Sequence, residues 1–186
     1  MIPEKQTRQK QIALGICGSV AAYKACELTR LCVKNGIGVF PIMTAAAQKF
    51  VTPLTFQTLA RNPVQTDIFA PVLSWEPEHI AIAQKCALLV VAPCTANVLA
   101  KITHGIADDS LSAAALAFAP SKIILAPAMN SAMFDNPATQ TNIATLRSRG
   151  ITVIEPAVGE LACGDSAKGR MPEPAKIYEI IAARIQ

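Results

Sequence analysis

The sequence predicts an α/β protein in which helices cover both faces of a mostly parallel sheet. Short apolar runs alternate with helical patterns along the whole chain, and no internal repeat or low-complexity linker interrupts them. The 186 residues are 52% hydrophobic and 16% charged, which suits one well-buried domain over 1–186. These observations predict a Rossmann-like, three-layer αβα sandwich. The runs expected to form its strands are Ile12–Cys17, Ile37–Met43, Leu88–Ala92, Lys122–Ala126 and Ile151–Ile154.

Helix signals fill the intervals between these runs. Ser19 is expected to cap a helix that continues to Asn35, with Gly36 just beyond its end. Asp109 is expected to cap a second helix over 110–118, because its carboxylate can accept hydrogen bonds from the first free amide groups. Further helices are expected from Pro137 to the residue before Gly150 and from about Pro174 to Ile185.

Three segments depart from this alternation. Pro41 lies inside the second apolar run and lacks an N–H for the ladder, which predicts an edge or irregular position there. Residues 62–78 are rich in proline and have no clear periodicity, so we expect a long excursion near the active face. Residues 1–10 are expected to form a flexible tail.

Charge and cysteine content exclude several classes of protein. The net charge is +4, but residues 1–10 alone contribute +2 of it, and no basic run with interleaved aromatic residues follows. Nucleic acid is therefore not an expected partner. The six cysteines form no CxxC pair and no spacing suited to zinc, so we expect no metal site. Such a pattern is typical of a reduced, cytoplasmic protein.

The N-terminal region invites comparison with a secretory signal, because a basic stretch precedes the apolar segment Ile12–Ala22. Gly15 and Gly18 interrupt that segment, and it continues directly into an amphipathic helix pattern, which disfavours a signal. No stretch reaches the roughly 18 apolar residues that a membrane span requires. We therefore expect a cytoplasmic protein that does not enter a membrane.

Small polar residues follow four of the predicted strands. In open α/β sheets, ligands bind outside the carboxyl ends of the strands, so these turns are expected to converge on one crevice. Gly18 and Ser19 lead straight into a helix, whose free N–H groups and positive dipole suit a phosphate. The turn is not a GxGxxG motif, which disfavours a dinucleotide. The four turns are Gly15–Ser19, Thr44–Ala47, Pro93–Asn97 and Pro127–Phe134.

Four segments together resemble the homo-oligomeric flavin-containing cysteine decarboxylases. They are Gly18–Lys24, His79–Ile80, Pro127–Met133 and Leu161–Met171. The combination of Pro-Ala-Met-Asn in the third with Ala-Cys-Gly in the fourth is highly specific, whereas neither is specific alone. The resemblance implies FMN as the cofactor. It places FMN near Gly18, Ser19, Val20, Thr44, Thr95, Ala96, Asn97 and Ala128.

The resemblance further implies decarboxylation of 4'-phosphopantothenoylcysteine to 4'-phosphopantetheine in coenzyme A biosynthesis. The flavin would oxidise the cysteine side chain to a thioaldehyde, which accepts the electrons released with CO2, and the resulting enethiol would then be reduced. The family is homo-oligomeric, as trimers or dodecamers built from trimers, with flavin sites between subunits. A synthetase that makes the substrate is an expected partner, fused or separate.

The resemblance implies catalytic roles for His79 and Cys163, and substrate carboxylate binding by Asn130. An imidazole exchanges protons near neutral pH and suits a base, although His79 could instead only begin a helix. Asn130 would bind a carboxylate without stabilising its charge, and it could also be an N-cap. Cys163 lies in a Gly-rich segment, 157–173, which we expect to form a flap that closes over the substrate. Its thiol would protonate the enethiol; the alternative is that it is a fortuitous surface cysteine.

Further candidates for substrate contacts are Met133, Ala162, Lys168 and Arg170. The two cations could meet a phosphate or carboxylate, or could be solvated charges. Three other functions compete. A lantibiotic-type peptidyl-cysteine decarboxylase shares the histidine and asparagine but does not need the flap cysteine. A flavin prenyltransferase lacks the Pro-Ala-Met-Asn and Ala-Cys-Gly pair. A non-catalytic flavin-binding regulatory subunit is disfavoured by the intact His79 and Cys163.

Overall fold

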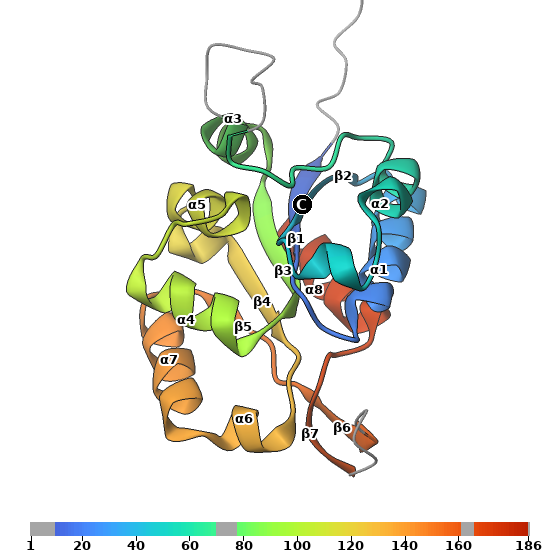
Figure 1. Ribbon diagram of the computed structural model, residues 1–186. Coiled ribbons are helices and arrows are strands. Elements are labelled where there is room, and N and C mark those ends of the chain that lie inside the picture. The colour runs from blue at the N-terminus through green and yellow to red at the C-terminus, as the bar shows by residue number, and fades with distance from the viewer. Residues whose placement is uncertain (1–9, 70–77, 161–165, 186) are drawn as a thin grey trace, which may run out of the picture.

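The computed structural model describes residues 10–69, 78–160 and 166–185, and it contains the predicted three-layer sandwich (Figure 1). Its centre is a five-stranded parallel sheet with the strand order β2-β1-β3-β4-β5. Each predicted strand is present to within two residues at either end. The strands are β1 (Gln11–Ile16), β2 (Gly38–Met43), β3 (Leu88–Cys94), β4 (Ile123–Pro127) and β5 (Thr152–Val153).

Helices cover both faces of this sheet, as Figure 1 shows. Alternate residues of β1 enter two separate buried clusters, with Ile12 and Leu14 in one and Ala13 in the other. A strand with apolar residues on both faces is typical of a buried parallel sheet. The first cluster packs against α1 (Ala22–Lys34), α2 (Pro53–Ala60) and α8 (Pro174–Arg184). The second packs against α3 (Glu78–Lys85), α4 (Ala96–His104), α5 (Ser110–Ala117) and α7 (Pro137–Ser148).

The helix ends agree with the sequence prediction in all but one case. Asp109 caps α5 through a reciprocal capping box with Ser112, and Gly36 follows α1 with a φ of 78°. The prediction that Ser19 is the N-cap of α1 is wrong. The N-cap is Ala21, and Ser19 lies two residues earlier, where its hydroxyl accepts a hydrogen bond from the Ala21 amide at 3.2 Å.

Pro41 occupies an edge strand, as predicted, because β2 is the outermost strand of the sheet on its side. The Pro41 carbonyl accepts a hydrogen bond from the Gln65 amide at 2.9 Å, and the Gln65 carbonyl accepts one from Met43 at 2.8 Å. Since the N and C=O of a strand residue face the same side, the missing Pro41 N–H faces away from β1. The segment after α2 therefore lies along the outer edge of β2; residues 70–77 of the predicted excursion lie outside the described residues.

Two further elements lie beyond the carboxyl end of β4. They are α6 (Ser131–Asp135) and an antiparallel ribbon of β6 (Ala157–Glu160) and β7 (Ser166–Arg170), with β7 beside α6. This ribbon lies within the predicted flap, whose residues 161–165 are outside the described part. Short 3-10 turns occur at η1 (Ala47–Lys49) and η2 (Pro120–Lys122). Within the described ranges, none of the helices has the length and apolar character to cross a bilayer.

Candidate functional site

The loops that follow β1, β2, β3 and β4 are joined to one another by backbone hydrogen bonds at the carboxyl edge of the sheet. The same series continues to β7, which comes from the opposite end of the chain. The bonds run from Thr44 N to Ile16 O (3.1 Å), Cys17 N to Pro93 O (3.3 Å), Ala128 N to Cys94 O (2.9 Å) and Met129 N to Gly169 O (3.0 Å). The four predicted turns therefore lie next to one another along this edge, and the crevice expected there stays a prediction. We call this series of loops the edge row.

Gly18 lets the first two loops of the edge row approach closely. A Cβ added to Gly18 would lie 2.5 Å from the Ala46 Cβ and 2.9 Å from the Ala46 carbonyl carbon, which no side chain could tolerate without a shift of the backbone. Thr44 begins this second loop, and its hydroxyl accepts a hydrogen bond from the Ala47 amide at 3.2 Å. A hydroxyl that accepts in this way still has its own proton to donate to a ligand.

Three helices begin at the edge row, and their N-termini bring free amide groups and positive dipole ends to it. α1 follows the Gly18 turn, α4 follows Thr95, and α6 follows Asn130. The Thr95 hydroxyl caps α4 by accepting from the Val98 amide at 3.4 Å. Helix N-termini attract anions through their free amide groups and their dipoles, so this edge suits a phosphate.

Asn130 caps α6, as its alternative interpretation predicted. Its side-chain oxygen accepts a hydrogen bond from the Ala132 amide at 2.8 Å, and the residue is exposed. Because the cap uses the oxygen, a hydrogen bond from this side chain to a carboxylate would come from its NH2 group. The structure thus confirms the N-cap, and the carboxylate-binding role of Asn130 stays a prediction.

Gly169 brings the third and fourth family segments into direct contact. It has a φ of 140°, and a Cβ at this position would lie 2.3 Å from the Met129 carbonyl oxygen. L-amino acids with side chains rarely adopt such a backbone conformation. β7 can therefore lie against the Pro127–Asn130 loop only because residue 169 is glycine.

The two cations predicted to contact substrate are paired within the chain. The Lys168 ammonium lies 2.9 Å from Glu155 Oε2 and 5.2 Å from the centre of the Phe134 ring. The Arg170 guanidinium lies 3.0 Å from Glu173. Hydrogen bonds from Lys168 and Arg147 lower the pKa of the Glu155 carboxyl. Exposed pairs of this kind are weak, so the cations remain available for exchange with an anionic ligand.

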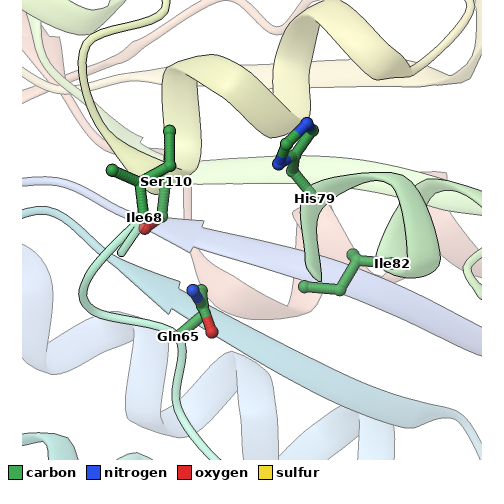
Figure 2. Close-up of a pocket in the computed structure, with 5 residues that line it drawn as sticks. All are labelled: Gln65, Ile68, His79, Ile82 and Ser110. Atoms are coloured by element: carbon green, nitrogen blue, oxygen red, sulfur yellow. The ribbon is translucent and has the colours of Figure 1, made fainter. Parts of the chain in front are cut away.

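His79 lies at the start of α3, half-buried, and lines a hollow on the face of the sheet (Figure 2). The hollow has a volume of about 10 Å³, which is room for one water molecule and far too little for a flavin. The described lining of this hollow contains no residue of the edge row. The lining residues are Gln65, Ile68, His79, Ile82 and Ser110.

Two buried thiols, Cys17 and Cys94, lie at the strand ends that lead into the edge row. Burial raises the pKa of the Cys17 thiol to about 12, and burial likewise raises the pKa of Cys94 well above its usual value. A thiol held in its protonated form is a poor nucleophile. Buried cysteines of this kind behave as small apolar residues. Ala162 and Cys163 lie outside the described residues.

Apolar side chains flank the edge row in the isolated chain. Val20, a predicted FMN contact, is 61% exposed, and Met133, a predicted substrate contact, is 50% exposed. Tyr23 of α1 is exposed as well. Of the other predicted FMN contacts, Ala128 is buried and Asn97 is exposed. Sequence reasoning missed Ser110 of the His79 hollow, because nothing in the local pattern distinguishes it from the capping serine at 112.

The chain matches the Flavoprotein family over residues 1–186. It belongs to the Flavoprotein family. This flavoprotein is 45% identical over 171 residues to the coenzyme A biosynthesis bifunctional protein CoaBC of Bacillus subtilis (strain 168). The aligned region covers 92% of this chain and 42% of that relative. The chain thus spans less than half the length of the curated relatives it matches.

Two solved structures show the same fold. One is a cysteine-to-serine mutant of a PPC decarboxylase complexed with pantothenoylaminoethenethiol, with a TM-score of 0.85, 31% identity, and coverage of 94% of this chain and 97% of that one. The other is the FMN-dependent cysteine decarboxylase SpaF, with a TM-score of 0.76, 31% identity, and coverage of 95% and 98%. The predicted fold and the predicted family resemblance are confirmed.

Proposed function

We propose that this flavoprotein is an FMN-dependent decarboxylase that converts 4'-phosphopantothenoylcysteine to 4'-phosphopantetheine in coenzyme A biosynthesis. The observation that carries the proposal is the contact of Gly169 with Met129 at the edge row. It joins the loop that holds Asn130 to the ribbon that leads to Cys163, at an edge whose helix N-termini suit a phosphate. The relatives named for coenzyme A biosynthesis and PPC decarboxylase support the choice of substrate.

The edge row has the properties that an FMN site requires. The turn at Gly18 and Ser19 and the starts of α1 and α4 offer amide groups to a phosphate, and the Thr44 hydroxyl can donate beside them. Thr95, Ala96, Asn97 and Ala128 are small enough to leave room for a planar ring. When bound, FMN supplies an oxidant for the cysteine side chain and returns the electrons later.

The chain's own residues would bind and orient the substrate and would transfer protons to and from it. The Asn130 amide would hold the carboxylate through a neutral donor, which avoids stabilising the ground state against loss of CO2. His79 would accept the thiol proton of the substrate cysteine, and the Cys163 thiol would return a proton to the enethiol. A cysteine-to-serine mutant of the PPC decarboxylase relative was solved with an aminoethenethiol compound, which is the chemical class expected to accumulate without that proton donor.

We also propose that the active form is a homo-oligomer, a trimer or a dodecamer of trimers. The described lining of the His79 hollow contains no residue of the edge row, whereas the proposed reaction needs both. A neighbouring copy would bring a second set of elements to the edge row and would cover the exposed Val20, Tyr23 and Met133. Its assembly can be measured by light scattering of the flavin-loaded protein.

We place this enzyme in the cytoplasm with a synthetase, fused or separate, as the source of its substrate. The described cysteines are all free, which suits a reducing compartment. The bifunctional relatives are more than twice as long as the region they share with this chain, which supports a second activity in the same pathway.

The proposal is tested with purified protein and phosphopantothenoylcysteine. We expect flavin absorbance, release of CO2, and a product lighter than the substrate by CO2 alone. A product lighter by CO2 and two hydrogens would instead indicate the lantibiotic-type oxidative reaction. Flavin absorbance without any CO2 release would indicate the regulatory subunit.

A further inference from the structure

The Ser110 hydroxyl is a buried polar group for which no hydrogen-bond partner exists among the described residues. The residue is 6% exposed and is the first residue of α5. An unpaired buried hydroxyl is unfavourable, so in native proteins such groups normally bind a water molecule or a ligand.

The N-terminus of α5 does not need this hydroxyl. Asp109 accepts a hydrogen bond from the Ser112 amide at 2.8 Å, and the Ser112 hydroxyl accepts one from the Asp109 amide at 3.1 Å. These two bonds complete the capping box without Ser110. The Ser110 side chain is therefore available to the hollow that it lines.

That hollow combines three polar side chains with two apolar ones. Figure 2 shows Ser110 and His79 on opposite sides of it, with Gln65 near a third side. Its volume of about 10 Å³ matches one water molecule, and a buried water typically makes about three hydrogen bonds. The Gln65 side chain is held in place because its NH2 group donates to the Asp67 carbonyl at 2.6 Å.

We propose that Ser110 is a positioning residue for His79, acting through one water molecule that both side chains bind in this hollow. The water fixes the ring orientation and the tautomer of the imidazole, so that its other nitrogen meets the substrate thiol. The catalytic consequence rests on the proposed function, in which His79 is the base; the water site itself does not.

The charged groups around His79 on the described elements stay the same when Ser110 is changed. α5 contributes Asp109 at its N-cap, which is paired with Lys101 at 2.9 Å. The segment after α2 contributes Asp67, α3 carries Lys85, and β1 has no ionisable residue. A change in the titration of His79 therefore reports the lost hydrogen bond.

The test is an NMR titration of the two imidazoles, since the chain has only His79 and His104. In Ser110→Ala we expect the midpoint of His79 to move by about 0.5 pH units, the size of one hydrogen bond, while that of His104 stays fixed. Ser112→Ala is the matched control: it weakens the capping box of the same helix and should move neither midpoint. An unmoved His79 midpoint in Ser110→Ala, or an equal shift in both variants, overturns the proposal.

Turnover provides the second measurement. Ser110→Ala should keep its FMN and its thermal stability but lose about tenfold in kcat, a fraction of the 10²–10⁴ that a general base contributes. Its pH profile should be displaced, whereas that of Ser112→Ala should match the wild type. Wild-type turnover together with an unchanged profile in Ser110→Ala refutes the positioning role. If the wild type fails to release CO2, the proposed function fails, and the NMR titration still decides the water site.

Discussion

Replacing Gly169 with alanine tests whether the β6–β7 ribbon is held against the loop after β4. The residue has a φ of 140°, and an added Cβ would lie 2.3 Å from the Met129 carbonyl oxygen and 3.4 Å from the Ser131 amide. Neither atom is the end of a flexible side chain. The ribbon or the loop must therefore move, and the Met129–Gly169 hydrogen bond of 3.0 Å must break.

The expected loss follows from these two effects. An unfavourable backbone conformation costs about 1–3 kcal/mol, and the lost hydrogen bond about 0.5–1.5 kcal/mol. For a chain of this size each kcal/mol lowers Tm by about 2–4 °C, so we expect a fall of about 3–18 °C in a thermal unfolding experiment. Hydrogen exchange of the Met129 amide should accelerate, and turnover should fall because the Asn130 loop and the flap lose their contact.

Gly36→Ala is the control for backbone strain alone. Gly36 has a φ of 78°, and a Cβ there would meet nothing within 4 Å, so we expect a cost of about 1–2 kcal/mol without loss of turnover. If Gly169→Ala unfolds at the same temperature as Gly36→Ala, with unchanged Met129 exchange and activity, the ribbon contact is not what organises the site.

Three further outcomes are expected. His79→Asn should retain flavin absorbance but release no CO2; appreciable turnover would remove His79 as the base. Cys163→Ser should accumulate the enethiol, two hydrogens lighter than the final product by mass spectrometry; full product formation would exclude Cys163 from the mechanism. Burial raises the pKa of the Asp109 carboxyl, but bonds from Ser112 and Lys101 outweigh it and lower the pKa below 3.8. Because the folded-state pKa is lowered, the ionised Asp109 carboxylate stabilises the fold above its unfolded-state pKa, and this stabilisation is lost as the pH falls. Asp109→Ala should therefore lower the free energy of unfolding by about 1 kcal/mol at pH 7 and by progressively less below about pH 4. A difference in the free energy of denaturant unfolding between the two proteins that stays constant from pH 7 to acid would contradict this.

The central sheet was predictable because parallel strands with two buried faces appear as continuous apolar runs. Ile12–Cys17 and Leu88–Ala92 differ from the observed strands by at most two residues at either end. The edge position of Pro41 followed from its missing amide, and the cap at Asp109 from its carboxylate. These features depend on local chemistry, which the sequence displays directly.

Other features depend on contacts between distant segments. Ser19 has the chemistry of an N-cap, but its hydroxyl is used in the turn before α1, so the helix begins at Ala22. The short helix α2 and the β6–β7 ribbon have little periodicity of their own. The roles of Gly169 and Ser110 come from the loop and the histidine they face, more than thirty residues away along the chain.

The candidate site was predictable in a similar, partial way. The convergence of four polar turns followed from the topology of a parallel sheet, and the edge row contains the residues expected for FMN. The sequence could not show that Lys168 and Arg170 are engaged by Glu155 and Glu173. Nor could it show that His79 lines a hollow together with Ser110, because that depends on how α3 packs against α5.

The most direct measurement of the central claim is the mass of the product formed from 4'-phosphopantothenoylcysteine by the purified, FMN-loaded protein. The proposed function predicts a single product, lighter than the substrate by CO2 alone, with the flavin returned to its oxidised spectrum after turnover. Unchanged substrate, or a product lighter by CO2 and two hydrogens, would contradict it.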